Sequence, residues 1–379
     1  MSKIYLHIGM PKTGTSSLQA FLGLNRKLLL KKGVDFPDGG DFLLLRWIPG
    51  VHNGLWTRYT YNKPEFQKLC DQTYKLCENS PIVLFSDEGV FHSYIKGREK
   101  VRGLAENARA HGHSLEIIMY LRRQDEFLMS NWAQIVKVRS PKSFDEWMAK
   151  RRSDGDEADY YEYLSNLAED VGKEHLHVRI YEKSRFTSGE RTIFSDFLEI
   201  LGIDDLTGFE YPERMKNVSL QDIYLETKQR LNRDPRFQIN KGVAEEEDDA
   251  YRMATDVKDI LLNLQEEARE NGTLKNRKPM SSAQCRELLK EYEERNEKTA
   301  AEFLGLAPGT PLFSEEPKGE WDKASYTDDE VFDVMAETLM RLEQRYITQR
   351  TDYRKLKEQT RLKNIPAFAA GRLMDHFKK

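Results

Sequence analysis

Residues 3–17 read KIYLHIGMPKTGTSS, and they are the clearest indication of the fold class in this chain. Residues 3–8 alternate in polarity and are rich in strand-forming side chains, so we predict a β-strand there. Gly9 and Gly14 bound the loop that follows, and apolar residues at helical spacing begin at Leu18. A strand, a glycine-rich loop and a helix in this order open an α/β unit.

Three further apolar runs predict buried parallel strands. They lie at residues 82–85, 115–121 and 176–181. Segments with helical periodicity separate and flank them, at residues 64–78, 96–111, 125–138 and 160–171. This alternation predicts an α/β fold: a P-loop-like parallel sheet flanked by helices, with a helical C-terminal extension. In such sheets, ligands bind beyond the carboxyl ends of the strands.

The second half of the chain differs in composition from the first. An acidic run occupies residues 245–249, and helical patterns surround it. Thr327 and Glu330 form a capping-box pattern before a long charged helix. We predict four parts: a core at residues 1–233, a helical acidic insert at 234–278, a C-terminal part of the core at 279–319 and a long helical tail at 320–379.

The composition argues against several classes of protein. The chain has 379 residues, 39% hydrophobic and 32% charged, with a net charge of −4. This apolar content argues against disorder, and the lack of a basic excess argues against nucleic-acid binding. We expect no membrane span and no signal peptide, because no apolar run is long enough. Three cysteines predict neither a disulfide framework nor a metal site, so we expect a cytoplasmic protein.

The loop after the first strand predicts an anion site, because backbone N–H groups and a helix N-terminus both attract negative charge. In the similar Walker A pattern, a lysine follows the second glycine. Here Thr15 follows Gly14, and Lys12 precedes it. A P-loop kinase would also need an aspartate near Mg²⁺, for which Asp87 is the candidate. We therefore expect an anion other than a Mg-nucleotide; the alternative is a turn whose hydroxyls merely cap a helix.

Two motifs resemble the sulfotransferases that use 3′-phosphoadenosine 5′-phosphosulfate (PAPS) as donor. Residues 11–19, PKTGTSSLQ, are similar to the phosphosulfate loop of that family. Residues 120–130, YLRRQDEFLMS, are similar to its 3′-phosphate segment. The likeness is greatest to bacterial carbohydrate-type members, which are related to the heparan sulfate sulfotransferases. It covers roughly residues 3–225 and 279–313.

The resemblance implies one binding site for each end of the donor. It places Arg122 and Ser130 at the 3′-phosphate, although Phe127 replaces the usual second arginine. Since Arg123 follows directly, which guanidinium meets the phosphate stays open. Lys12 is the candidate cation for charge on the leaving phosphate, and no metal is required. The phosphosulfate loop comprises Pro11, Lys12, Thr13, Gly14, Thr15, Ser16 and Ser17.

The acceptor hydroxyl must lose a proton during transfer, and Glu88 is the leading candidate for the general base. It lies three residues past the second predicted strand, and the carbohydrate sulfotransferases use a glutamate. His52 and His92 are alternatives, since cytosolic small-molecule sulfotransferases use a histidine. His52 can instead contact the acceptor.

These motifs predict a sulfotransferase that moves a sulfuryl group from PAPS to a hydroxyl of a carbohydrate or glycolipid. We expect in-line attack assisted by a carboxylate base. Two other readings stay open. One is a P-loop kinase or nucleotide hydrolase, and the other is a catalytically inactive glycan-binding protein on the same fold.

The tail helix carries a separate prediction. From Phe332 to Leu356, apolar or neutral residues recur at alternating spacings of three and four, as in the seam of a heptad repeat. A helix with such a stripe must cover it by packing. We expect a homodimer through the C-terminal helix, with docking on its own domain as the alternative.

Overall fold

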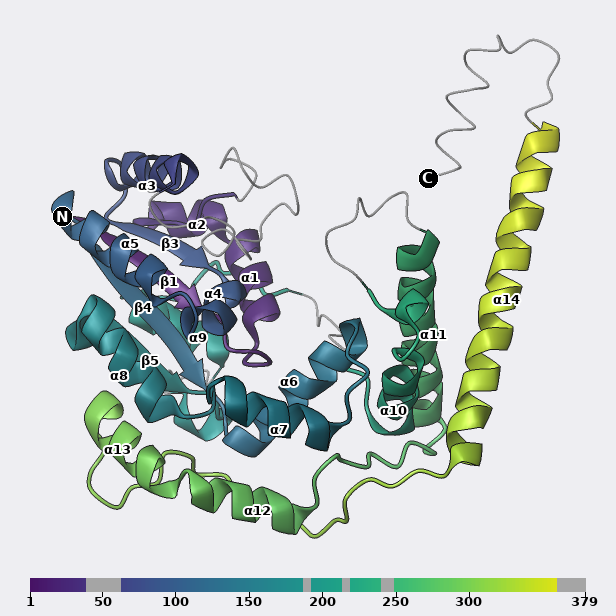
Figure 1. The fold of residues 1–379 in the computed structure, drawn as a ribbon. Helices are drawn as coiled ribbons and strands as arrows, with labels where there is room; N and C mark the ends of the chain where they lie inside the picture. Colours follow the sequence, from purple (N-terminus) through teal and green to yellow (C-terminus); the bar gives the residue numbers. More distant parts are fainter. Residues whose placement is uncertain (39–62, 187–191, 213–218, 240–248, 360–379) are drawn as a thin grey trace. The chain divides into compact units, whose positions relative to one another are not determined.

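The computed structural model describes residues 1–38, 63–186, 192–212, 219–239 and 249–359. Within these ranges, five strands form one sheet, and all of their pairings are parallel. The strands are β1 Lys3–Ile8, β2 Val34–Asp35, β3 Ile82–Ser86, β4 Ser114–Leu121 and β5 Leu176–Ile180. The predicted α/β fold, a parallel sheet flanked by helices, is confirmed (Figure 1).

Helices connect the strands and make up most of the second half of the described chain. The first seven are α1 Thr15–Leu24, α2 Arg26–Lys31, α3 Pro64–Cys77, α4 Glu88–Tyr94, α5 Arg98–Ala110, α6 Gln124–Val138 and α7 Phe144–Asp154. The others are α8 Tyr160–Val171, α9 Ile193–Ile200, α10 Asp222–Leu231, α11 Asp249–Glu270, α12 Ser282–Glu291, α13 Glu293–Leu304 and α14 Asp328–Gln359. Short 3₁₀ helices are η2 Lys173–His175, η3 Lys183–Arg185 and η4 Pro235–Phe237. None of the described helices is both long and apolar enough to cross a membrane.

The strand order β2-β3-β1-β4-β5 places β1 at the centre of the sheet. His7 of β1 pairs with Ser86 of β3 on one side and with Ile118 of β4 on the other. The chain leaves β1 toward β2 and β3 and then crosses to β4 on the opposite side. The loops after β1, β3 and β4 therefore meet where the strand order reverses, which is the usual ligand crevice of such sheets.

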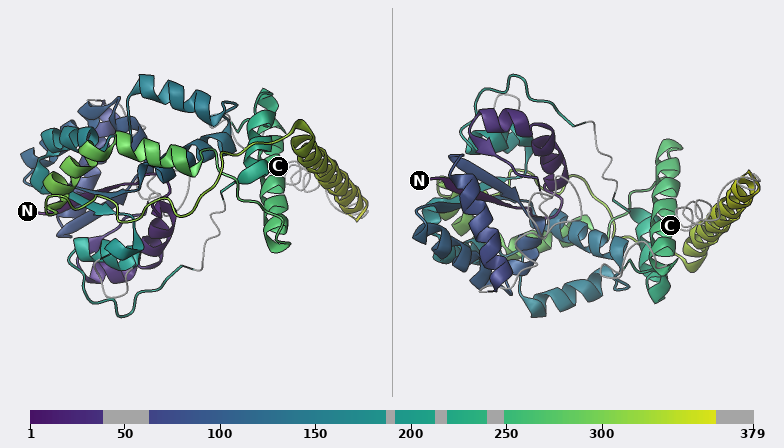
Figure 2. Two further views of the ribbon diagram at one scale, coloured as in Figure 1. Left: turned by 90° about the horizontal axis from the view of Figure 1, so that it is seen from below. Right: turned by 90° about the horizontal axis from the view of Figure 1, so that it is seen from above.

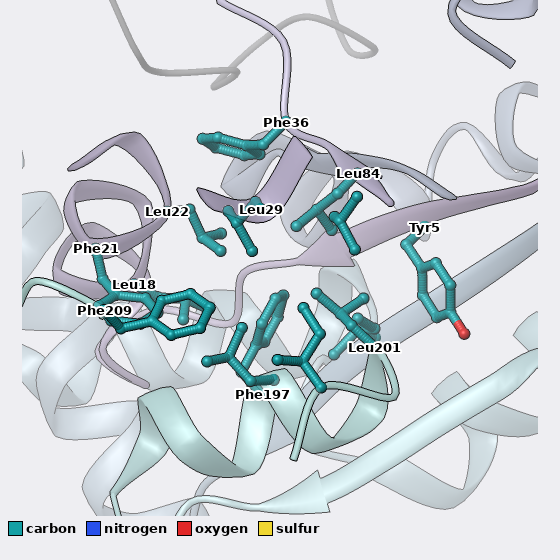
Figure 3. Close-up of a cluster of buried hydrophobic side chains, with 14 of the residues drawn as sticks. Tyr5, Leu18, Phe21, Leu22, Leu29, Phe36, Leu84, Phe197, Leu201 and Phe209 are labelled. Atoms are coloured by element: carbon teal, nitrogen blue, oxygen red, sulfur yellow. The ribbon is translucent and has the colours of Figure 1, made fainter. Parts of the chain in front are cut away.

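Helices cover both faces of the sheet (Figure 2). On one face, α1, α2 and α9 enclose a buried cluster with Tyr5 of β1 and Leu84 of β3 (Figure 3). Phe21 lies within this cluster and stacks on Phe194, with the ring centroids 4.6 Å apart. On the other face, Leu6 of β1 lies beside residues of α4 and α5. With both faces covered, the strands need apolar residues in continuous runs, as the sequence has them.

The contacts divide the chain into two compact units. Unit 1 contains the sheet and comprises Met1–Ser130, Arg151–Lys216 and Ala283–Lys318. Unit 2 comprises Asn131–Lys150, Asn217–Ser282 and Gly319–Lys379, and in it α14 packs against α10 and α11. The described residues of 217–233 thus cluster with these helices. The candidate loop and the residues around it all belong to unit 1.

Candidate functional site

Hydrogen bonds within the loop hold the segment between β1 and α1 in shape. The N–H and the hydroxyl of Thr13 both donate to the carbonyl oxygen of Met10, at 3.3 and 2.8 Å. Lys12 and Gly14 both have left-handed backbones, with φ of 64° and 80°. A Cβ atom at Gly14 would also lie 3.3 Å from the hydroxyl oxygen of Tyr181, so this position requires glycine.

The N-terminus of α1 is not capped by a side chain. Gly14 provides no side-chain cap, and the first turn contains no acidic residue. The first N–H groups of any helix lack acceptors within the helix. Thr15 is only 4% exposed, and its Oγ1 finds no hydrogen-bond partner within the described chain. The half-buried Ser16 and Ser17 add two hydroxyls in the same turn. These donors and the positive helix end suit a phosphate or sulfate group.

The start of α4 lies directly beside this loop. A Cβ atom at Gly9 would lie 2.7 Å from Cγ2 of Thr15 and 3.3 Å from Cα of Glu88. Asp87 is fully buried and caps α4, since its Oδ1 accepts a 2.9 Å hydrogen bond from the N–H of Gly89. Glu88 is the first residue of the helix. The glycine and the cap together set Glu88 against the loop.

Three charged candidates converge at this edge of the sheet. Burial lowers the pKa of Lys12, the negative charge of Glu88 raises it, and the positive charge of Arg122 lowers it again. Nη1 of Arg122 donates to the carbonyl oxygen of Lys12 at 3.1 Å. The structure thus brings Lys12, Glu88 and Arg122 together from the loops after β1, β3 and β4.

The adjacent arginines after β4 have different partners. Arg123 is buried and forms a bidentate ion pair with Asp125, in which Nε lies 2.6 Å from Oδ1 and Nη2 lies 3.0 Å from Oδ2. Its Nη1 donates to the carbonyl oxygen of Glu315 at 3.0 Å. Arg122 pairs with Glu126 at 3.0 Å and contacts the loop. Of the two adjacent arginines, Arg122 is thus the one that contacts the loop, and its assignment to the 3′-phosphate stays a prediction.

Ser130 lies on α6 and is half-buried. Glu126 and Ser130 are four residues apart in α6 and so lie on one side of the helix, and Glu126 pairs with Arg122, which precedes the helix. Phe127 is fully buried and packs edge-to-face on Phe91. Phe127 is therefore a core residue.

A buried network of polar side chains links the two strands and the helix that flank the loop between β1 and α1. His7 is 1% exposed, and its Nδ1 lies 2.8 Å from Oγ of Ser86. Nε2 of Gln19 donates to the carbonyl oxygen of Ser86 at 3.0 Å. Burial lowers the pKa of His7 to about 3, so the ring is neutral at physiological pH. The network ties β1, β3 and α1 together. Sequence reasoning missed it, although polar residues at the ends of two buried strands were a usable signal.

Residues near β5 complete the surroundings of the loop. The hydroxyl of Tyr160 donates to the carbonyl oxygen of Arg122 at 2.5 Å. Glu182 accepts hydrogen bonds from the N–H groups of Ser314, at 3.0 Å, and Glu315, at 3.2 Å. These bonds hold the returning segment of unit 1 against the ends of β4 and β5. Sequence reasoning did not find these roles, because the pairs are far apart in the chain and have no motif.

The alternative bases are placed differently. His52 lies outside the described residues. His92 lies on α4, four residues after Glu88, and is exposed, with Nδ1 3.4 Å from Oε1 of Glu157. Of the two described candidates, Glu88 is the one whose charge acts on Lys12.

Comparison with known proteins does not assign a family. No family model matches the chain, and no solved structure matches it. An uncharacterized protein of Archaeoglobus fulgidus is 29% identical over 201 residues, which are 53% of this chain and 49% of the relative. The match thus spans about half the length of that relative, and the name of the relative indicates no activity.

Proposed function

We propose that the protein is a sulfotransferase that moves a sulfuryl group from PAPS to a hydroxyl of a carbohydrate or glycolipid. The observation that supports this best is the convergence of Lys12, Glu88 and Arg122 at the uncapped start of α1. Sulfuryl transfer needs an anion cradle, a cation near the leaving group and a base for the acceptor. Each requirement has a candidate residue at this one edge of the sheet.

The two anionic ends of the donor match two groups of residues. The first turn of α1 and Lys12 suit the phosphosulfate, and Thr15 offers it a buried hydroxyl that has no hydrogen-bond partner in the described part of the chain. Arg122 and Ser130 suit the 3′-phosphate, because a guanidinium presents a fork of donors to phosphate oxygens. A donor bound across both groups would leave its sulfuryl group near Glu88.

The residues divide the chemistry as follows. Glu88 takes the proton of the acceptor hydroxyl as the acceptor oxygen bonds to sulfur. The bond between sulfur and the bridging oxygen breaks in line, and its electron pair stays on the departing phosphate. Lys12 and the N–H groups of α1 stabilise the charge that develops there. The proton thus ends on Glu88, and the negative charge ends on the bisphosphate product.

Two features speak against a kinase or nucleotide hydrolase. Thr15 occupies the Walker lysine position, and Asp87, the candidate Mg²⁺ partner, is buried and caps α4. An inactive glycan-binding protein would have no need of a carboxylate beside Lys12. The three cysteines are buried free thiols, which fit the cytoplasmic location that we propose.

Donor binding is the first test. We expect calorimetry to detect binding of PAPS and of 3′-phosphoadenosine 5′-phosphate, and we expect both to raise the melting temperature more than ATP with Mg²⁺. Arg122→Ala should weaken both. Lys12→Ala should reduce turnover more than affinity for the desulfated product, because Lys12 acts on charge that develops during transfer. Lys31→Ala, an exposed lysine at the end of α2, is the matched control. Equal stabilisation by ATP and Mg²⁺ would favour the kinase.

Transfer is the second test. Sulfate-labelled PAPS is incubated with a panel of glycans, glycolipids and small hydroxyl compounds, and labelled products are separated. We expect label on at least one carbohydrate acceptor. Donor binding without transfer to any acceptor, together with glycan binding, would favour the inactive glycan-binding protein.

A further inference from the structure

One face of α14 packs on the helices of its own unit. Val331, Thr338 and Leu342 are buried, and the helix contacts α10 and α11. Arg341 forms a two-pronged ion pair with Glu267 of α11, at 2.6 and 2.9 Å. Among the described residues, the helix therefore docks on its own chain along this one side.

Another face of α14 carries an exposed apolar stripe, formed by Phe332, Leu339, Met340 and Ile347. Their exposed fractions are 67%, 47%, 57% and 56%, and they are half of the eight exposed large hydrophobic residues in the described chain. At 3.6 residues per turn, the four fall within about a third of the helix circumference. The heptad seam that we predicted is thus divided, because Leu342 is buried while Phe332 and Leu339 are exposed.

The charges of α14 are separated along its length. Residues 328–340 contain five acidic residues and no basic one. Residues 341–359 contain six basic and three acidic residues. A helix with one acidic and one basic half is complementary to a second copy of itself that runs in the opposite direction.

We propose that two copies of the protein pair through their apolar stripes, with the α14 helices antiparallel about a two-fold axis between Leu339 and Met340. This axis sets Phe332 opposite Ile347 of the partner subunit and Asp329 opposite Arg350 of the partner subunit. Such an interface uses the same patch on both chains, as two-fold symmetry requires. The stripe and the charge pattern have the same centre, so one arrangement satisfies both.

The alternative parallel arrangement is disfavoured by charge. It would set the acidic halves side by side, and like charges repel at short range. In the antiparallel arrangement Glu343, the one charge within the stripe, faces Ala336, which has a small side chain. The stripe is about 22 Å long at 1.5 Å per residue, so we expect a modest interface and micromolar affinity.

The first experiment removes the stripe in the full chain. Sedimentation velocity and light scattering should show a dimer at micromolar concentrations. Leu339→Lys with Met340→Lys should shift it to a monomer and leave donor binding unchanged. The matched control, Thr348→Lys with Gln349→Lys, adds the same charge at exposed positions on the other side of α14 from the stripe and should stay dimeric. A wild-type chain that stays monomeric throughout this range overturns the proposal. Truncation near Trp321 is a poorer test, since it uncovers α10 and α11.

The second experiment tests the orientation. In an antiparallel pair, Asp329→Arg or Arg350→Asp alone sets like charges together at both ends. Each should weaken dimerisation about threefold to tenfold, and the double exchange should restore it. Circular dichroism checks that helix content is kept. Single variants that leave the dissociation constant unchanged would overturn the antiparallel arrangement.

Discussion

The helices α1 and α14 begin in opposite ways. Gly14 gives α1 no side-chain cap, and no acidic residue lies in its first turn. At α14, the N–H of Glu330 donates to Oγ1 of Thr327 at 3.1 Å, and the N–H of Thr327 donates to Oε2 of Glu330 at 2.9 Å. Three acidic residues also fill that first turn. The positive end of α14 is thus satisfied from within the chain, while that of α1 is left open.

The comparison shows what turns a helix start into a candidate site. Every helix start has spare N–H groups and a positive end, so these features alone do not distinguish α1 from α14. The missing side-chain cap, the missing acidic residue and the buried Thr15 hydroxyl, which has no hydrogen-bond partner among the described residues, do distinguish it. A side-chain cap is worth about 1 kcal/mol against alanine but only roughly a few tenths against glycine, so with Gly14 at its start α1 forgoes a small part of the stability that α14 has.

The largest effect, on the rate of transfer, is expected from substitution of Glu88, which lies beside the uncapped N-terminus of α1. Glu88→Gln keeps the shape of the side chain but cannot accept a proton, so transfer should fall about 10²–10⁴-fold. Affinity for 3′-phosphoadenosine 5′-phosphate should stay the same. Single-turnover transfer and calorimetry measure the two quantities. Glu99→Gln, at an exposed position of α5, is the control. If Glu88→Gln transfers at nearly the wild-type rate, His52→Ala becomes the variant to test.

The pH dependence of kcat/KM tests the role of Lys12, the proposed cation at the uncapped N-terminus of α1. Burial lowers the pKa of Lys12 from its usual 10.5, so the charged form is lost earlier as the pH rises. We expect kcat/KM to fall about tenfold per pH unit above that lowered pKa, because this constant reports the free enzyme. An anion bound beside Lys12 raises the pKa again, so kcat should fall only at higher pH. Lys12→Arg keeps its charge throughout and should lack this alkaline decline. A decline that survives in Lys12→Arg would belong to another group.

A third variant makes α1 resemble α14. Ser16→Asp puts an acidic side chain in the first turn, where it should compete with a bound anion. We expect affinity for the bisphosphate to fall about tenfold and thermal stability to stay equal or rise slightly. Ser16→Asn, which has a similar shape and no charge, is the control. Unchanged affinity in Ser16→Asp would mean that the anion binds elsewhere.

The smallest effect is expected when the side-chain cap at the N-terminus of α14 is removed. Thr327→Ala removes the hydroxyl that caps α14, which should cost about 1 kcal/mol of stability. Thermal unfolding should shift down by a few degrees, while donor affinity and transfer stay as in the wild type. Thr327→Ser restores a hydroxyl and should recover most of the loss. A change in donor affinity in Thr327→Ala would contradict the separation of the two helix ends.

Sequence patterns predicted the strands that carry the loop because those strands are buried on both faces. An alternating, strand-forming stretch marked β1, and continuous apolar runs marked β3, β4 and β5, each to within one residue at either end. The pattern missed β2, since the two residues Val34 and Asp35 are too few to show any period. Composition likewise could not reveal that the described part of 217–233 clusters with α11 and α14, which depends on contacts distant in sequence.

Sequence motifs located the candidate site, but they could not show which hydrogen bonds and ion pairs its side chains form. Glycine spacing located the loop, and the position after a strand singled out Glu88 and Arg122. The resemblance placed Arg122 at the phosphate, but the sequence could not rule out its neighbour Arg123, because only the fold reveals that Asp125 and the carbonyl group of Glu315 hold Arg123. The apolar spacing of α14 could not reveal its division into two faces, since a helix pattern does not say which neighbours cover it.

The left-handed backbone at Lys12 creates a conflict between thermal stability and the proposed activity, because the residue that suits the backbone best is not the one that the activity needs. A side chain in this conformation costs about 1–2 kcal/mol, and glycine avoids that cost. Lys12→Gly should therefore raise the unfolding temperature while it removes the proposed catalytic cation. A library screened only for survival at high temperature would enrich this change and discard activity. Engineering for robustness should hold residue 12 fixed and seek gains in unit 2.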